Sequence, residues 1–333
     1  MPGMRRALVV LLLVLASCSS SDGKEAAPST TTTTAVPAKA SAGCDAAKVG
    51  PGETKVTTTS GGVERWYLRH VPAKQGPLPV IVDFHGYSEG ADIHAKLSAL
   101  GPFGDEQGFV TITPQGTGDP IRWDTGLDSA DMHFVGELLD EVERTLCVDT
   151  NRIYAAGLSN GAFMTSSVAC ALADRFAAVA PVAGIRDPEG CAPARKIPIL
   201  AIHGTADTFV AYDGGLGEGA LNLPAPDGSG RTLRDVGAAD QPKGPSIPEI
   251  AAAWAKRDGC KTEPLTVALT DDVDRLTYPC PKGMQVELYR VDEGGHSWPG
   301  SPLGPAIEKV VGKTTTTISA NAVIWSFFQD HPL

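Results

Sequence analysis

Residues 157–161 read Gly-Leu-Ser-Asn-Gly, the G-x-S-x-G pattern in which a serine hydroxyl can act as a nucleophile. The preceding residues 152–156 are typical of a short buried strand, and residues 162–173 are mostly small and apolar, as in a helix packed closely on a sheet. We therefore expect Ser159 at a sharp strand-to-helix turn, the nucleophile elbow. Glycines suit such a turn because strand and helix approach closely there and the serine backbone is strained.

A second stretch, residues 86–90, reads Gly-Tyr-Ser-Glu-Gly and matches the same pattern. It also follows a strand-like run, residues 79–84, but the downstream residues 91–101 alternate polar and apolar types without a small-residue helix face. A His-Gly turn after an early strand can instead supply a backbone N–H to an oxyanion hole. The context therefore favours Ser159 over Ser88 as the nucleophile.

A serine nucleophile needs a base and an acid that orients it. Asp207 follows an apolar strand-like run at 197–203, and His296 lies on a glycine-rich loop after another predicted strand at 285–291. Functional side chains of open α/β sheets gather at the carboxyl ends of strands, where all three candidates are expected. Asp213 is an alternative orienting acid, but Asp207 is nearer to its strand end.

The remaining histidines show no spacing typical of metal ligands. His70, His94, His133 and His331 are interpreted as surface or packing residues, and His203 belongs to the strand-end turn. No metal or other cofactor is predicted.

Five segments together resemble one family of enzymes: residues 83–86 (Asp-Phe-His-Gly), 152–154 (Arg-Ile-Tyr), 157–164 (Gly-Leu-Ser-Asn-Gly-Ala-Phe-Met), 203–207 (His-Gly-Thr-Ala-Asp) and 294–300 (Gly-Gly-His-Ser-Trp-Pro-Gly). The chain resembles the polyhydroxybutyrate depolymerase and feruloyl esterase group over nearly all of residues 60–333. The resemblance implies an α/β-hydrolase with Ser159 as nucleophile, His296 as base and Asp207 as orienting acid. It also implies an oxyanion hole made by the backbone N–H groups of Tyr87 and Asn160.

The chain departs from polymer-degrading members of that group at Tyr87, where they often carry cysteine, and it shows no added polymer-binding domain. The expected substrates are short-chain acyl, aryl-acid or hydroxyalkanoate esters, with soluble esters preferred over polymer. Two alternatives remain: a catalytically silent binding lipoprotein with the same fold, and a serine peptidase.

Composition and patterning fit one α/β domain. Strand-like and helix-like stretches alternate, and residues 131–146 carry one apolar and one acidic face. This pattern predicts a mostly parallel sheet with helices on both faces, in a single catalytic domain over residues 44–333. The formal net charge of −11 disfavours a nucleic-acid partner.

The amino-terminal residues are typical of an export signal. Arg5 and Arg6 precede an apolar run at 7–16 that is too short to span a bilayer, so residues 1–17 are predicted to be a signal peptide. Residues 15–18, Leu-Ala-Ser-Cys, resemble a bacterial lipoprotein box, which predicts a lipidated Cys18; an ordinary signal peptide is the alternative. Residues 18–43 would tether the enzyme to the outer face of the cell membrane.

The other six cysteines form an even set without a C-x-x-C pair, which indicates disulfides in an exported protein. Proximity in sequence favours pairing Cys170 with Cys191 and Cys260 with Cys280. Cys44 and Cys147 then remain as the third pair.

A Gly- and Pro-rich insertion, residues 213–248, separates Asp207 from a predicted helix at 248–257. It is interpreted either as a wall or lid over the acyl site or as a solvated excursion. Trp123 and Trp298 are candidate substrate-binding residues that could stack on an aromatic acid or a sugar, or pack their own loops.

Overall fold

The computed structural model describes residues 36–46 and 48–333. The predicted signal peptide, Cys18 and the tether up to residue 35 lie outside the described residues. Pro37–Leu333 forms one compact unit, so residues 37–43, which the sequence assigned to the tether, belong to it. Ser41 shows why, because its hydroxyl donates a hydrogen bond to the Leu146 carbonyl across 2.7 Å.

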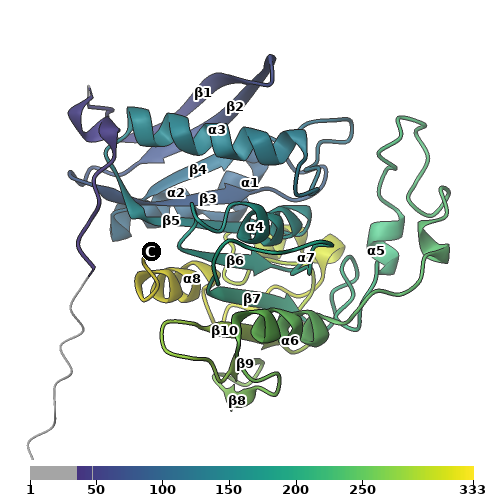
Figure 1. Ribbon diagram of the computed structural model, residues 1–333. Helices are drawn as coiled ribbons and strands as arrows, with labels where there is room; N and C mark the ends of the chain where they lie inside the picture. The colour runs from purple at the N-terminus through teal and green to yellow at the C-terminus, as the bar shows by residue number, and fades with distance from the viewer. Residues whose placement is uncertain (1–35, 47) are drawn as a thin grey trace, which may run out of the picture. The chain divides into compact units, whose positions relative to one another are not determined.

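Ten strands of the described chain form one sheet in the order β1-β2-β4-β3-β5-β6-β7-β10-β9-β8 (Figure 1). The strands are β1 (Gly52–Ser60), β2 (Val63–Val71), β3 (Leu78–Phe84), β4 (Val110–Pro114), β5 (Val148–Leu158), β6 (Ala178–Val182), β7 (Ile199–Gly204), β8 (Leu265–Ala268), β9 (Val273–Tyr278) and β10 (Val286–Val291). The central run from β4 to β10 is parallel. The strands at the two edges pair antiparallel.

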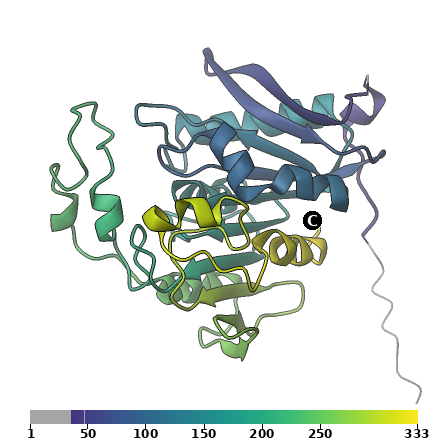
Figure 2. The ribbon, with the colours of Figure 1, turned by 180° about the vertical axis from the view of Figure 1, so that it is seen from behind.

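Helices cover both faces of this sheet, as Figures 1 and 2 show from opposite sides. The α-helices are α1 (Ala91–Ser98), α2 (Leu100–Gln107), α3 (Ala130–Thr145), α4 (Asn160–Ala171), α5 (Glu218–Leu221), α6 (Ile247–Asp258), α7 (Gly304–Val311) and α8 (Ala320–Gln329), with short 3-10 helices η1 (Ala42–Asp45) and η2 (Ala238–Asp240). Helices α3, α4 and α6 pack on one face, and α1, α2 and α8 pack on the other. None of the helices in the described ranges is long and apolar enough to cross a membrane.

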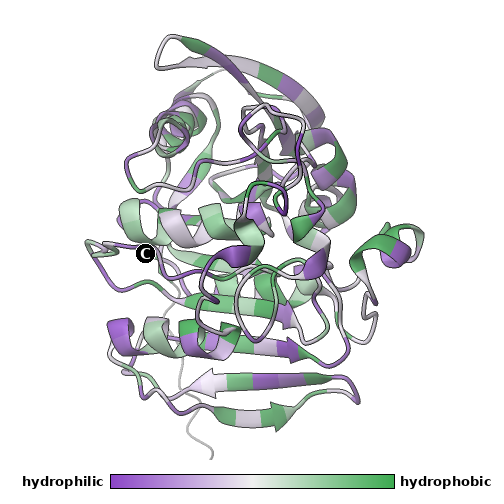
Figure 3. Ribbon diagram, turned by 90° about the vertical axis from the view of Figure 1, so that its right-hand side faces the viewer, coloured by the Kyte–Doolittle hydropathy of each residue, from purple (hydrophilic) through white to green (hydrophobic). Residues whose placement is uncertain are grey.

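The buried strands feed two separate cores because neighbouring side chains of a strand point to opposite faces. In β3, Val80 and Val82 join the core under α3 and α4, while Ile81 joins the core under α8. In β5, Ile153 faces the first core and Tyr154 the second, where its ring stacks on Phe328. This burial on both faces explains the nearly continuous apolar character of the central strands, which Figure 3 shows in green.

The predicted fold class is confirmed: a mostly parallel sheet carries helices on both faces. The helix predicted at 131–146 is Ala130–Thr145, and the one predicted at 248–257 is Ile247–Asp258. The antiparallel edge strands were not predicted. β8 is only four residues long and is exposed along its whole length.

The three predicted disulfides are present, joining Cys44 to Cys147, Cys170 to Cys191 and Cys260 to Cys280. The first ties the start of the compact unit to the residue before β5, 103 positions later in the chain.

Candidate active site

Ser159 occupies the turn between β5 and α4 with φ 58° and ψ −120°. A residue with a side chain rarely adopts positive φ, and such strain persists only where the surroundings hold it. The backbone N–H of Ser159 donates to the Val182 carbonyl at 3.0 Å, and its carbonyl accepts from Phe163 at 2.9 Å. These bonds fix a strand–serine–helix turn with the serine partly exposed.

The two glycines of this turn allow the close approach that the sequence predicted. A Cβ on Gly161 would lie 2.0 Å from the Phe84 carbonyl oxygen, and one on Gly157 would lie 2.6 Å from the Gly161 carbonyl oxygen. Both distances are far below van der Waals contact with backbone atoms. Any side chain at either position would therefore force β3, β5 and α4 apart.

The second pentapeptide forms a different turn beside the first. Ser88 also has positive φ, 59°, but it is exposed, and its N–H donates to the Ile121 carbonyl. A Cβ on Gly86 would lie 3.6 Å from the Cβ of Ser159. The turn that carries Gly86 and Tyr87 is therefore in contact with the elbow.

His296 and Asp207 form a direct hydrogen bond, from Nδ1 of the imidazole to Oδ2 of the carboxylate, at 2.8 Å. Asp207 follows β7 and His296 follows β10, and these strands are parallel neighbours. Asp213, the alternative acid, is exposed. Ser159 follows β5 at the same carboxyl edge of the sheet.

Both oxygens of the Asp207 carboxylate accept hydrogen bonds. Its Oδ1 accepts the backbone N–H groups of Phe209 and Val210 at 2.8 and 2.9 Å, and His203 Nε2 lies 3.3 Å from Oδ2. Burial alone would raise the pKa of the Asp207 carboxyl. The opposing effects of His296 and His203 are stronger and lower it well below its ordinary range. Asp207 is thus a carboxylate at neutral pH.

The loops after β7 and β10 touch through their backbones. Ala206 donates its N–H to the Gly294 carbonyl at 2.9 Å, and a Cβ on Gly204 would lie 2.2 Å from the Gly294 carbonyl oxygen. Gly295 is equally enclosed, because a Cβ added at this position would lie 2.1 Å from the Val311 carbonyl oxygen. The glycines before His296 thus allow the close packing that brings its ring to Asp207.

Two backbone N–H groups near Ser159 have no acceptor among the hydrogen bonds of the described residues, namely those of Tyr87 and Asn160. Asn160 begins α4, where the first N–H groups of a helix lack intrahelical partners. The side-chain oxygen of Asn160, Oδ1, accepts the backbone N–H of Trp123 at 2.7 Å. Free N–H groups at such a place can receive a negatively charged oxygen.

The two candidate substrate-binding tryptophans are buried. Trp123 is 2% exposed and donates its indole N–H to the His85 carbonyl, and Trp298 is 1% exposed and donates to Asn321. Their burial favours the interpretation that they pack the loops of the site.

Two other aromatic side chains belong to the site: that of Phe209, which the sequence analysis did not single out, and that of Tyr87, which it named only for its backbone N–H. The Phe209 ring stacks on the His296 imidazole with a 4.8 Å centroid separation. Tyr87 donates its hydroxyl to the Pro224 carbonyl at 2.8 Å, which joins the 213–248 insertion to the turn beside Ser159. This contact favours the wall interpretation of the insertion, whose helix α5 stands at the right in Figure 1. No sequence motif marks either contact.

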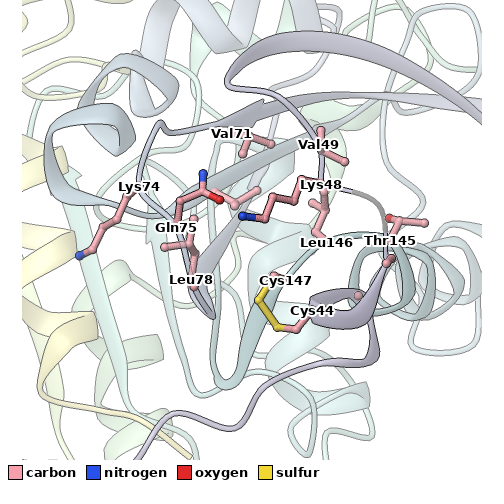
Figure 4. A pocket seen from close by; sticks show the side chains of 14 residues that line it. Cys44, Lys48, Val49, Val71, Lys74, Gln75, Leu78, Thr145, Leu146 and Cys147 are labelled. Carbon is pink, nitrogen blue, oxygen red and sulfur yellow. A yellow bond between two sulfur atoms is a disulfide. The ribbon is translucent and has the colours of Figure 1, made fainter.

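A cavity of about 260 Å³ lies elsewhere in the molecule, beside the Cys44–Cys147 disulfide (Figure 4). Lys48, Lys74 and Gln75 line it together with the first residue of β3, Leu78. It therefore lies at the amino ends of the strands, opposite Ser159, and none of the candidate catalytic or oxyanion-hole residues lines it.

Comparison with known proteins supports the resemblance inferred from the motifs, although no family model matches the chain. The chain is 30% identical over 236 residues to feruloyl esterase B of Piromyces equi, covering 68% of this chain and 41% of that protein. It is 29% identical over 281 residues to the putative esterase NocK of Nocardia uniformis subsp. tsuyamanensis, covering 78% and 77%. It is 25% identical over 255 residues to poly(3-hydroxyalkanoate) depolymerase C of Paucimonas lemoignei, covering 72% and 59%.

Among solved structures, the acetyl xylan esterase from Aspergillus awamori matches with a TM-score of 0.54 and 14% identity, over 73% of this chain and 94% of that one. The fold is that of the α/β-hydrolase esterases, and the predicted likeness to feruloyl esterases and polyhydroxyalkanoate depolymerases is confirmed. The chain spans only 41% of the feruloyl esterase it matches, so its own activity is a separate question.

Proposed function

We propose that this protein is a serine esterase that hydrolyses carboxylic esters through Ser159, His296 and Asp207. The observation that carries the proposal is the 2.8 Å hydrogen bond between His296 and Asp207 at the sheet edge where β5 ends in the strained Ser159. The esterase names of the relatives support the same class of reaction.

The reaction follows the two-step course of serine hydrolases. His296 takes the Ser159 proton through Nε2 while Oγ attacks the ester carbonyl, and Asp207 keeps the other ring nitrogen, Nδ1, protonated. The N–H groups of Tyr87 and Asn160 bind the oxyanion of the tetrahedral intermediate. His296 then returns the proton to the leaving alcohol, and water cleaves the acyl-enzyme by the same roles.

The substrates that best suit the site are soluble short-chain, aryl-acid or hydroxyalkanoate esters. The insertion joined to Tyr87 by Pro224 would restrict the space beside Ser159, which disfavours an insoluble polymer chain. Phe209 and Tyr87 present aromatic surface near the reacting groups, as an aryl acid requires.

A substrate panel tests this proposal: p-nitrophenyl acyl esters, methyl esters of aryl acids, hydroxybutyrate oligomers, a polyhydroxybutyrate suspension and chromogenic peptides. We expect turnover of the soluble esters, slower clearing of the polymer and no cleavage of the peptides. A fluorophosphonate probe with peptide mapping should label Ser159. Peptide cleavage without ester hydrolysis, or folded protein that the probe does not label, would reject the proposal.

The same proposal includes export and a lipid anchor at Cys18, which lies outside the described residues. The three disulfides support an oxidising compartment. Mass spectrometry of the mature amino terminus should find a lipidated Cys18, and Cys18→Ala should release or misprocess the protein. Cleavage elsewhere without lipid would contradict the anchor.

A further inference from the structure

The second pentapeptide contributes one residue, Glu89, to a buried charged cluster that the proposed mechanism does not use. His94, on α1, is fully buried between Asp83, near the end of β3, and Glu89, in the pentapeptide. His94 Nε2 donates to Asp83 at 2.8 Å, and Nδ1 lies 3.2 Å from Glu89. The hydroxyl of Ser98 donates a hydrogen bond to the other Asp83 oxygen, Oδ2, at 2.6 Å.

The cluster consists of one cation between two carboxylates. Burial alone would lower the pKa of His94, but Asp83 and Glu89 raise it to about 10. Burial would raise the pKa of Glu89, and His94 together with the Gly86 N–H lowers it. His94 and Glu89 are therefore both charged at neutral pH. Buried charges lower the stability of the folded state unless they are paired and hydrogen-bonded. Movement of one group away from its partners would therefore be costly, which holds the three side chains in place.

Glu89 connects the cluster to the peptide beside Ser159. Its carboxylate accepts the Gly86 N–H at 2.5 Å, and His85 Nδ1 donates to the Gly86 carbonyl at 2.7 Å. That carbonyl and the Tyr87 N–H belong to one planar trans peptide, so they point in opposite directions. Fixing the carbonyl and N–H of Gly86 therefore fixes the direction of the Tyr87 N–H.

The cluster also contacts the loop that carries His296. Trp298, two residues after His296, packs edge-on against the His94 ring with a centroid separation of 5.9 Å. His94 thus lies between the turn that carries the Tyr87 N–H and the loop that carries His296. Among the residues described, no group of His, Cys, Asp and Glu is arranged to hold a metal ion.

We infer that Glu89, His94 and Asp83 form a positioning unit that aims the Tyr87 N–H at the oxyanion, which gives the second G-x-S-x-G pentapeptide a role without a nucleophile. The inference rests on the proposed esterase function. It predicts that losing Glu89 weakens binding of the transition state while leaving binding of the ground-state ester intact.

The test compares Glu89→Ala and Glu89→Gln with the wild type, using p-nitrophenyl acetate and an aryl trifluoromethyl ketone, whose serine adduct carries an oxyanion. Fluorophosphonate titration of a separate sample gives the concentration of reactive Ser159. Dividing the rate by this concentration gives kcat per folded, reactive site. Glu287→Gln is the control, because Glu287 is 4% exposed and lies near the amino end of β10, far along the strand from His296.

We expect Glu89→Ala to lower kcat per titrated site by about 10-fold to 100-fold through misplacement of one oxyanion donor. KM should stay within about threefold, and affinity for the trifluoromethyl ketone should fall in parallel with kcat. Glu89→Gln keeps an oxygen for the Gly86 N–H and should lose only roughly 3-fold to 10-fold. The control should keep the wild-type kcat and inhibitor affinity even if it melts earlier.

Glu89→Gln preserves the shape of the side chain and decides the result if Glu89→Ala does not fold. Wild-type kcat and inhibitor affinity in this variant, or a change in KM alone, would overturn the inference while leaving the esterase proposal intact. A wild-type protein that is neither labelled nor active would overturn both.

Discussion

His296 donates a hydrogen bond to Asp207 across 2.8 Å although the two residues are 89 positions apart in the chain. Asp207 cannot turn away from this bond, because its other oxygen accepts two backbone N–H groups. The imidazole is therefore held with Nδ1 protonated and Nε2 available as a base.

Asp207→Asn should lower kcat by about 10⁴-fold while the protein stays folded. The two backbone N–H groups would retain the amide oxygen, so the NH₂ group would face His296 and impose the wrong tautomer. Ester hydrolysis by the purified variant measures the loss. Asp213→Asn, a change at an exposed carboxylate, is the matched control and should keep full activity; equal losses would contradict the role of Asp207.

Ser159→Ala should reduce ester hydrolysis by a factor on the order of 10⁵ or more, because it removes the oxygen that forms the acyl-enzyme. Ser88→Ala removes an exposed hydroxyl from the neighbouring turn and should cost at most about 10-fold to 100-fold. Steady-state kinetics on one soluble ester compares the two. A larger loss from Ser88→Ala would reverse the assignment of the nucleophile.

Tyr87→Phe should raise KM for a bulky aryl-acid ester by roughly fivefold, which corresponds to one hydrogen bond of about 1 kcal/mol. The variant loses the bond to Pro224 that holds the insertion, but it keeps the backbone N–H. We therefore expect kcat to be unchanged and p-nitrophenyl acetate to be unaffected. A fall in kcat for both esters would place the hydroxyl in the chemistry instead.

Asp258→Asn should stabilise the protein at neutral pH. Asp258 is fully buried at the last position of α6, where a negative charge also opposes the helix dipole, and burial raises the pKa of its carboxyl to about 6. The folded state thus binds this proton more tightly than the unfolded state. Its contribution to stability is complete below about pH 4 and is lost as pH rises through about 6.

The asparagine variant should therefore unfold with a free energy higher by about 1–3 kcal/mol at pH 7.5, and by much less at pH 4. Chemical denaturation at both pH values measures the difference. A gain of the same size at pH 4 and pH 7.5 would show that the titration of Asp258 is not its cause.

Removing the Cys44–Cys147 disulfide by serine substitution should cost more stability than removing Cys260–Cys280. The first closes a sequence separation of 103 residues and the second one of 20. The loop-entropy model gives about 4.7 and about 3.3 kcal/mol. Guanidinium unfolding of the two double variants measures both losses, and an equal cost would contradict this ranking.

The sequence predicted the features that depend on neighbours in the chain. The elbow around Ser159 is encoded by adjacent glycines between a strand and a helix, and β3, β5 and β7 are visible as apolar runs because both of their faces are buried. The cysteine pairs followed from their number and spacing. β8, an exposed four-residue strand at the sheet edge, was not predicted.

Only the tertiary structure decided which distant groups meet. Asp207 and Asp213 both follow β7, and the register of β7 against β10, with the backbone contact of Gly204 and Gly294, selects Asp207 as the partner of His296. His94 has no distinctive sequence context, yet packing encloses it between two carboxylates. Local patterns fix turns and strand faces, whereas burial and hydrogen-bond partners of single side chains depend on segments that folding brings together.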